Sequence, residues 1–521
     1  MVSLLFYVHG ALFLAAGAVA KARLPPIPSD LTTPVQQRIA FDGPNSQFKA
    51  QDETAVAREK VAERRPQANE PYSFTQASPG KACVKYGTPD CSLKKQVCSS
   101  KSGVTYPSSR TWFNSVTIPG LSPATKYCYQ IVSTNSTKST FLSPRLAGDK
   151  TPFSINAIID LGVYGEDGYT IKMDGKKRDQ IPYIPPSLNH TTIKRLADTI
   201  NQYEFVIHPG DLGYADTWML RGHNTKDGRN AYQAILEQFY DQLSPISSRK
   251  PYMASPGNHE AACQEIPLST GHCPAGQKNF TDFLTRFGSS MPTPFVSTSR
   301  DAKARINANK AKKLAKPPFW FSFEYGMAHM VMIDTETDFA GAPDGPGGSA
   351  GLDGGPFGGP NQQLLFLEAD LASVDRTVTP WVIVAGHRPW YSTGAERCKP
   401  CRAAFEGLLY KYGVDLAVFG HVHNSQRLMP VFNETVDPAG LNNPKAPMYI
   451  VAGGAGNIEG LAAVGAKPSY TAFAYADDFS YATISFVHGQ DLRIDFYRSS
   501  TGELLDTCTL HKLHREQFVV Q

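Results

Sequence analysis

The 521-residue sequence lacks the features that would place a protein in a membrane or on a nucleic acid. After the N-terminus, no segment is long and apolar enough to span a bilayer, and the polar C-terminal tail shows no anchor signal. The net charge of +4 is too small to indicate a nucleic-acid partner. A composition of 41% hydrophobic and 19% charged residues is that of a globular protein, and the length allows two or three domains.

Residues 1–20 have the pattern of a secretory signal peptide. An apolar stretch ends in the small residues Ala18, Ala20 and Ala22, and cleavage is expected near Ala20 or Ala22. No Lys or Arg precedes the stretch, and an uncleaved anchor is the alternative, although the stretch is short for a membrane span. We therefore expect a secreted, extracellular protein.

Cysteine is scarce, and most of the nine cysteines are expected to pair in an oxidising compartment. Short separations predict local disulfides between Cys263 and Cys273 and between Cys398 and Cys401. Four further cysteines lie close together in the sequence: Cys83, Cys91, Cys98 and Cys128. They can pair among themselves, but the sequence does not determine which cysteine pairs with which. Cys508 is then left over. A zinc site at Cys398 and Cys401 is the alternative, but the sequence has no second C-x-x-C motif.

Four N-x-Thr sequons lie along the chain, at Asn135, Asn189, Asn279 and Asn433. In a secreted protein such sequons are acceptors for N-linked glycans, and a bulky glycan requires a position on the surface. We therefore expect a glycoprotein in which these four asparagines are exposed.

Residues 21–150 are expected to form an all-β sandwich. Period-two apolar runs such as Thr111–Ile118 are separated by Gly, Pro and Ser. The Leu-x-Pro-x-Thr-x-Tyr pattern of residues 121–127 resembles the turn into a late strand of fibronectin type III domains. Residues 48–70 depart from this pattern, because they are charged and helix-prone where the sandwich needs a strand. Either the strand is therefore displaced from this segment, or the segment is an insertion or a gene-model error.

Residues 151–500 are expected to form an α/β domain, and residues 501–521 a last strand and a tail. Five apolar runs of strand length each end in a polar residue, at Asp160, Asp211, Asp334, His387 and His421. Helix-like stretches lie between these runs, at 192–203, 231–243, 361–373 and 402–412. Strands that are apolar throughout are buried on both faces. The pattern predicts a layered β-sandwich flanked by helices, with the reactive residues at the strand ends.

The Lys-rich segment 302–316 stands apart from these runs. We expect a solvated helix or loop there, and a basic rim that attracts anionic substrates is the alternative.

The polar residues at the strand ends have metal-binding chemistry. Asp160 and Asp211 stand beside glycines, which allow a ligand to approach closely, and a buried carboxylate is costly without a cation. The His-x-His segment 421–423 can direct both imidazoles to one site, because residues i and i+2 of an extended segment point the same way. Asn258 and His387 add an amide oxygen and a third imidazole. Each residue alone could be a helix cap or a packed histidine, but together they predict two adjacent metal ions and hydrolysis of a phosphate ester.

The sequence blocks that carry these residues resemble those of the purple acid phosphatases, which are calcineurin-like metallophosphoesterases. The blocks are Asp160-Leu-Gly, Gly210-Asp-Leu-Gly-Tyr, Gly257-Asn-His-Glu, Gly386-His and Gly420-His-Val-His. Many members of the wider superfamily have His two residues after the first Asp. Here that position is Gly162 and the sequence offers Tyr214 instead, which is the mark of the purple group. The module before residue 150 matches the fibronectin-like domain of the large plant and fungal members.

The resemblance implies a ligand set. Fe(III) would be held by Asp160, Tyr214 and His423, a divalent Zn(II), Fe(II) or Mn(II) ion by Asn258, His387 and His421, and Asp211 would bridge the two. The same resemblance makes His259 the candidate catalytic residue, which would hydrogen-bond the phosphate or protonate the leaving alkoxide. A packed histidine is the alternative. Asn258, Glu396 and Arg397 are candidate substrate-binding residues, and the last two follow the segment after which plant members have further histidines.

These assignments predict a secreted acid phosphatase that hydrolyses phosphomonoesters by direct attack of a metal-bound hydroxide, without a phosphoenzyme. Phytate is a reasonable substrate. A metallophosphodiesterase is the alternative with the same chemistry, and a non-catalytic secreted binding protein is the alternative from another class. The expected partners are small phosphate esters. The sequence does not determine the subunit number, and a homodimer is one candidate.

Overall fold

The computed structural model describes residues 36–42, 47–55 and 81–514, with gaps at 89, 108, 110, 133–136, 164–190, 220–227, 262–272, 293–296, 298, 349–353 and 395. The expected signal peptide and the sequons at Asn135 and Asn189 lie outside the described residues. Across the part of the chain that is described, no helix is both long and apolar enough to cross a bilayer.

The N-terminal module, residues 36–142, is a sandwich of two antiparallel sheets, which confirms the predicted all-β domain. One sheet has the order β1-β2-β5, with β1 at Gln36–Asp42, β2 at Gln47–Ala55 and β5 at Thr111–Ile118. The other has the order β4-β3-β6-β7, with β3 at Cys83–Gly87, β4 at Lys95–Cys98, β6 at Lys126–Ile131 and β7 at Ser139–Leu142. Disulfides Cys83–Cys98 and Cys91–Cys128 lie within this module, as the sequence allowed.

Strand β2 lies in the charged segment 48–70, where the sequence did not indicate the strand that the sandwich needs. Over its length β2 pairs with β1 on one side and with β5 on the other, in registers such as Lys49↔Ala40 and Lys49↔Thr117. Tertiary contacts readily outweigh intrinsic helix propensity. Here pairing on both sides satisfies the backbone N–H and C=O groups of the strand. Residues 56–70 lie outside the described part of the chain.

The domain that follows the N-terminal module contains two mixed sheets. The first has the order β10-β9-β8-β20-β21-β22, with strands Tyr252–Ser255, Val206–Pro209, Phe153–Ala157, Ser480–His488, Asp491–Arg498 and Leu504–His511. The second has the order β11-β12-β13-β14-β18-β15-β19, with strands Phe321–Tyr325, Ala328–Met332, Trp381–Ala385, Leu416–Phe419, Met448–Ala452, Ser425–Leu428 and Thr471–Tyr475. A short hairpin joins β16 (Val431–Phe432) to β17 (Thr435–Val436).

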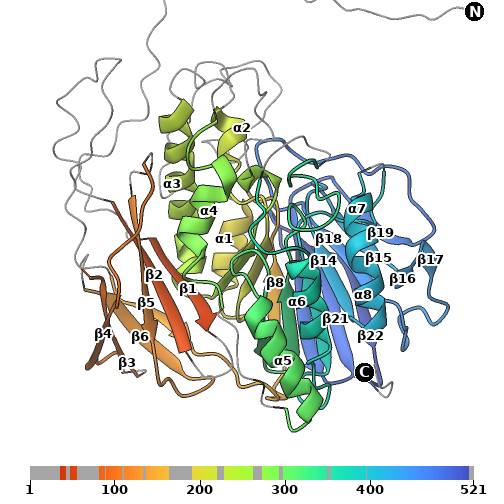
Figure 1. The fold of residues 1–521 in the computed structure, drawn as a ribbon, viewed down its shortest axis with the longest axis horizontal. Coiled ribbons are helices and arrows are strands. Elements are labelled where there is room, and N and C mark those ends of the chain that lie inside the picture. Colours follow the sequence, from red (N-terminus) through yellow and green to blue (C-terminus); the bar gives the residue numbers. More distant parts are fainter. Residues whose placement is uncertain are drawn as a thin grey trace, which may run out of the picture.

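Helices flank these sheets, as predicted for an α/β sandwich. They are α1 (Thr191–Asp198), α2 (Ala215–Met219), α3 (Gly228–Ser247), α4 (Thr281–Phe287), α5 (Ala302–Leu314), α6 (Gln362–Leu371), α7 (Lys399–Cys401) and α8 (Gly407–Lys411). A π-helical turn, Arg402–Glu406, makes α7 and α8 continuous. Figure 1 shows the orange N-terminal module beside α3 and α4, with the blue C-terminal strands on the opposite side. The Lys-rich segment is helix α5, which buries Ala304, Ala308 and Ala311.

Most of the parallel strands are buried along their whole length. Every residue of β9, β10, β12, β13 and β14 is buried, which confirms the interpretation of the apolar runs. In one sheet β8, β9 and β10 are parallel neighbours, and in the other β12, β13, β14 and β18 are. Because carboxyl ends of parallel strands meet at one edge of a sheet, the segments that follow these strands lie together.

Candidate metal centre

The predicted ligands follow the central strands of both sheets. Asp160 and Asp211 come after β8 and β9, and Asn258 opens a single 3-10 turn, Asn258–Glu260, after β10. His387 comes after β13 and His421 after β14 in the other sheet. The two sheets therefore each contribute ligands to one edge of the sandwich.

The side chains of these residues converge on two clusters that share one carboxylate. Ligand atoms of Asp160, Asp211 and His423 all lie within 4.8 Å of one another, and so do those of Asp211, His387 and His421. Asp211 belongs to both clusters, which is the position expected of a ligand that bridges two metal ions. This arrangement matches the division of ligands that the resemblance implies.

Tyr214 and Asn258 complete the set, one at each cluster. The Tyr214 hydroxyl lies 3.0 Å from Asp160 Oδ1, 3.3 Å from Asp211 Oδ2 and 2.8 Å from His423 Nε2. Asn258 Oδ1 lies 3.0 Å from His387 Nε2, which itself lies 2.9 Å from Asp211 Oδ2. The structure thus brings all seven predicted ligands together, although they are spread from residue 160 to residue 423.

The backbone at the centre is strained in a way that presents these side chains. Asp160, Asp211, Tyr214 and His421 have φ values of 59°, 54°, 52° and 64°, in the left-handed region that side chains other than glycine rarely adopt. Such strain persists only where the surroundings enforce it, and it concentrates at functional sites. A Cβ atom at Gly257 would lie 2.3 Å from Asp211 Oδ1. The glycine is therefore required there.

The electrostatics of the cluster call for cations. Burial raises the pKa of Asp160 well above its ordinary value, with Asp211 adding to the effect. Burial lowers the pKa of His387, but the carboxylates of Asp211 and Asp160 outweigh burial and raise it to about 9. The carboxylates therefore favour the protonated, positively charged form of His387. A bound metal ion would supply this positive charge in place of the proton. Hard oxygen donors combined with imidazoles suit Fe(III) and a divalent Zn, Fe or Mn ion, so the residues fit the implied pair of metals.

His259 is held beside the centre by Asp216, two residues after Tyr214. Its Nδ1 lies 2.9 Å from Asp216 Oδ1, and its Nε2 faces Asp211 Oδ2 at 3.9 Å. Burial lowers the pKa of His259, but Asp216 and Asp211 outweigh burial and raise it well above its ordinary value. Asp216 is itself fixed by Gln277, whose Nε2 donates to Oδ2 at 2.8 Å. This arrangement keeps a proton on His259 and directs Nε2 toward the cluster.

Sequence reasoning missed two residues that brace the ligand loops. Glu260 accepts backbone N–H bonds from Asp211 and Leu212, both at 2.8 Å, and from Gly257 at 3.0 Å. Asn457 donates from Nδ2 to the carbonyl of Asp160 at 3.1 Å. Glu260 belongs to the Gly-Asn-His-Glu block and could have been found there, whereas nothing in the local sequence marks Asn457.

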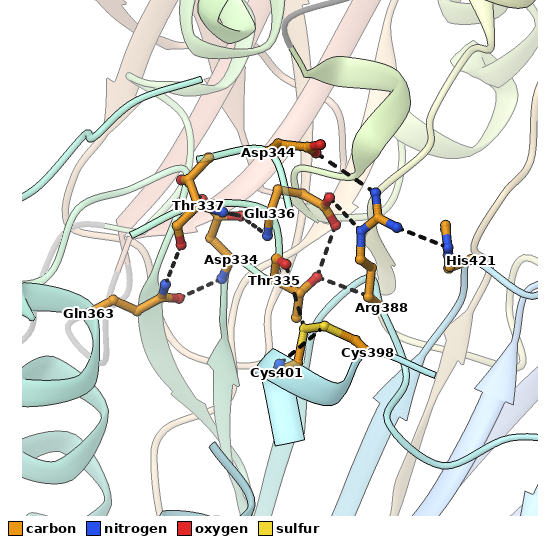
Figure 2. Close-up of a disulfide and its surroundings, with 10 residues drawn as sticks. All are labelled: Asp334, Thr335, Glu336, Thr337, Asp344, Gln363, Arg388, Cys398, Cys401 and His421. Carbon is orange, nitrogen blue, oxygen red and sulfur yellow. Dashed lines mark hydrogen bonds and ion pairs between the residues drawn. A yellow bond between two sulfur atoms is a disulfide. The ribbon is translucent and has the colours of Figure 1, made fainter. Parts of the chain in front are cut away.

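Arg388, which directly follows His387, is a third residue that the motifs did not indicate. Figure 2 shows its guanidinium between His421 and two buried carboxyls. Its Nη1 lies 3.0 Å from His421 Nε2, its Nε donates to Glu336 Oε2 at 2.7 Å, and its Nη2 lies 3.8 Å from Asp344 Oδ2. Burial, with Arg388 as the next cause, lowers the pKa of His421 well below its ordinary value. His421 is thereby kept neutral, as a metal ligand must be.

Four other predicted residues lie away from these clusters. Glu396 is exposed, and Arg397 is half-buried, where it donates to the Gly394 carbonyl at 3.2 Å. In the described structure neither side chain contacts a residue of the two clusters, so their substrate-binding role stays a prediction. The sequon residues Asn279 and Asn433 are both exposed, as a glycan requires.

The predicted cysteine pairs can be compared with the structure in part. The Cys398–Cys401 disulfide is present and Cys508 is free. Cys273 is disulfide-bonded, and Cys263 lies outside the described residues.

A two-sheet sandwich with two ligand clusters around a shared carboxylate defines a metallophosphoesterase. Family models match three successive parts of the chain: purple acid phosphatase, N-terminal domain, at 73–145; calcineurin-like phosphoesterase at 188–425; and iron/zinc purple acid phosphatase-like protein C at 446–507. The chain is 58% identical to acid phosphatase A of Cryphonectria parasitica, over 100% of both chains. It therefore belongs to the purple acid phosphatase family, which confirms the resemblance stated above.

Two further comparisons agree with this family. The chain is 28% identical to an acid phosphatase of Aspergillus ficuum, over 85% of this chain and 81% of the relative. Its fold is similar to that of a purple acid phosphatase from yellow lupin (Lupinus luteus) seeds, with a TM-score of 0.61 and 20% identity. That likeness covers 92% of this chain and 74% of the lupin chain.

Proposed function

We propose that the protein is a secreted acid phosphatase that hydrolyses phosphomonoesters, phytate among them, at an Fe(III)–M(II) centre without forming a phosphoenzyme. The observation that carries the proposal is the pair of ligand clusters that share Asp211. Secretion is supported by the disulfides of the chain, which persist in oxidising compartments. Activity toward phosphate esters is supported by the two fungal relatives, both named acid phosphatases.

Each cluster would hold one ion. Fe(III) would be held by Asp160, Tyr214 and His423, the divalent ion by Asn258, His387 and His421, and both by Asp211. When bound, such a pair supplies Lewis-acid activation of the water and of the phosphate ester. The hydrogen bond from His387 Nδ1 to the Pro209 carbonyl, at 3.2 Å, leaves Nε2 free to face the centre.

His259 would supply the proton that the leaving group needs. Asp216 accepts the Nδ1–H bond, so the proton available for transfer is on Nε2, which faces Asp211. Asp216 also raises the pKa of the imidazole and keeps it protonated. Protonation of the leaving alkoxide avoids the release of a strongly basic anion, which is the usual contribution of a general acid.

The test is a metal analysis, a visible spectrum and a substrate comparison on the purified glycoprotein. We expect two metal ions per chain and a broad visible band that disappears in Tyr214→Phe. We also expect faster turnover of p-nitrophenyl phosphate than of bis(p-nitrophenyl) phosphate. One metal ion per chain, or a band that survives in the variant, would contradict the iron–phenolate centre. Faster diester turnover would favour a phosphodiesterase, and absence of turnover with both metals bound would favour a binding protein.

A further inference from the structure

The Cys398–Cys401 disulfide occupies a different setting from the other disulfides that the structure describes in full. Strand β13, the loop after it, the helical segment 399–411 and strand β14 form a β–α–β unit, because β13 and β14 are parallel neighbours. The motif Cys-Lys-Pro-Cys begins this helical segment, with Cys398 as the N-cap of α7. The pairs Cys83–Cys98 and Cys91–Cys128 instead link strands and loops of the N-terminal module. C-x-x-C pairs are also the redox-active motif of disulfide oxidoreductases.

The two cysteines of this disulfide differ in burial. Cys401 is fully buried, whereas Cys398 is half-buried at the edge of the core. An incoming thiolate can therefore reach Cys398 and not Cys401. This asymmetry, with one reachable sulfur and one buried sulfur, fixes which bond an external thiol would form first.

A backbone N–H group points at the sulfur of Cys398. The backbone N–H of Cys401 donates to Cys398 Sγ at 3.1 Å, from the first turn of the helical segment. This donor would stabilise negative charge on Cys398 Sγ, and a stabilised thiolate makes a disulfide easier to reduce.

The buried sulfur also has a partner for its reduced form. Cys401 Sγ lies 3.7 Å from the carbonyl oxygen of Thr335, as Figure 2 shows beside Arg388. A thiol formed at Cys401 by reduction would find a hydrogen-bond acceptor in place, so the buried S–H is not left without a partner. Both redox states are therefore accommodated by the same surroundings.

We propose that Cys398 and Cys401 form a thiol–disulfide exchange site for peptide thiols, separate from the metal centre and independent of the phosphatase function. A peptide thiolate attacks Cys398 Sγ, forming a mixed disulfide while the Cys398–Cys401 bond breaks and Cys401 leaves as a thiolate. A second peptide thiol attacks the peptide sulfur of the mixed disulfide and releases a peptide disulfide and the Cys398 thiolate. Two electrons pass from the two peptide thiols to the cysteine pair, which then carries two thiols after protonation.

The first test measures how fast each disulfide of the native holoenzyme is reduced by glutathione, using alkylation and peptide mass spectrometry. We expect alkylation at Cys398 and Cys401 about tenfold faster, or more, than at Cys91 and Cys128, which is the matched internal control because Cys91 is also half-buried and Cys128 is also buried. Equal rates, or alkylation of Cys398 and Cys401 only after unfolding, would overturn the proposal.

The second test uses single variants to trap the intermediate. Cys401→Ser incubated with oxidised glutathione should form a glutathione adduct at Cys398, whereas Cys398→Ser should form none at the buried Cys401. Circular dichroism shows whether each variant is folded. A folded Cys401→Ser variant without the adduct, or equal adduct formation in both variants, would refute the exchange site, and the wild-type rates decide the question if a variant does not fold.

Discussion

At the scale of single residues, the metal centre depends on which of its side chains are charged and which are neutral. Burial raises the pKa of Asp160, while burial lowers the pKa of His423 to about 4. A neutral imidazole and a carboxylate that needs a cation are thus placed within one cluster. His259 differs from the ligand His423, because carboxylates raise its pKa well above the ordinary value. The same residue type therefore serves as a metal ligand in one place and as a proton donor in another.

Replacing His259 with Ala should lower kcat by about 10²- to 10⁴-fold, the usual contribution of a general acid. The ligand atoms of both clusters remain, so the metal content and the visible band should not change. The measurements are kcat with p-nitrophenyl phosphate and the absorbance spectrum. His488→Ala is the matched control, because His488 is an exposed histidine beside Asp491, on strands β20 and β21. Unchanged turnover in His259→Ala would show that this histidine only packs.

Replacing Asp216 with Asn should move the alkaline limb of the kcat–pH profile to lower pH. The Asp216 carboxylate raises the pKa of His259, and a neutral amide removes that effect, so the imidazole loses its proton at lower pH. The measurement is kcat across the pH range for both proteins. Asp198→Asn is the control, because Asp198 forms an exposed ion pair with Lys194. An alkaline limb that stays in place would rule out this positioning role.

At the scale of strands and helices, an element can be predicted where its own residues carry the pattern. It cannot be predicted where it depends on contacts with residues that are distant in the sequence. The apolar runs that end at Asp160, Asp211 and His387 identify β8, β9 and β13, because burial on both faces leaves a continuous pattern. Strand β2 could not be predicted, since its pairing with β1 and β5 outweighs its charged composition. Asn457 and Gln277 could not be predicted either, because only tertiary folding brings them to Asp160 and Asp216.

His329 in strand β12 makes the stability of the fold depend on pH. Its Nε2 lies 2.8 Å from Asp370 in helix α6, and its Nδ1 lies 3.6 Å from Glu324 in β11. Burial lowers the pKa of this histidine, but Asp370 and Glu324 outweigh burial and raise it to about 9. Because the folded pKa exceeds the unfolded value of about 6.5, the stabilisation is fully present below pH 6.5 and is lost as pH rises through 9.

The wild-type free energy of unfolding should therefore fall by about 3 kcal/mol between pH values near 6.5 and 9 through this group. His329→Gln, which cannot take up a proton, should remove that fall whatever its effect on stability at one pH. Urea titrations of both proteins at the two pH values give the difference. Equal falls in the two proteins would show that His329 is not the linked group.

At the scale of the whole molecule, the N-terminal module is fastened to the catalytic domain through polar contacts around α3 and α4. The Tyr106 hydroxyl donates to Asp282 Oδ1 at 2.5 Å, and the Tyr129 hydroxyl donates to the Ser248 carbonyl at 2.7 Å. Helix α3 also packs against β1. The segment that leads into α4 also reaches the metal centre, because Gln277, just before the turn Lys278–Phe280, donates to Asp216, the partner of His259.

Arg286 of helix α4 lies at the middle of this junction and should control whether the two parts unfold together. Its guanidinium pairs with Asp282 at 2.7 Å and lies over the rings of Phe113, at 4.4 Å, and Tyr240, at 4.3 Å. Arg286→Leu leaves the buried Asp282 carboxylate without its partner, which costs about 3–5 kcal/mol. We expect calorimetry to show two separate transitions in this variant and one in the wild type.

Two controls separate the loss of charge pairing from the loss of packing at this junction. Lys194→Met removes one member of the exposed pair Lys194–Asp198 and should change stability by less than about 1 kcal/mol. The double variant Arg286→Leu with Asp282→Leu removes both charges, so no carboxylate is left buried alone, and it should be more stable than Arg286→Leu alone. If the double variant is instead less stable than the single one, the Asp282 carboxylate stabilises the junction without Arg286, through the hydrogen bond that it accepts from Tyr106.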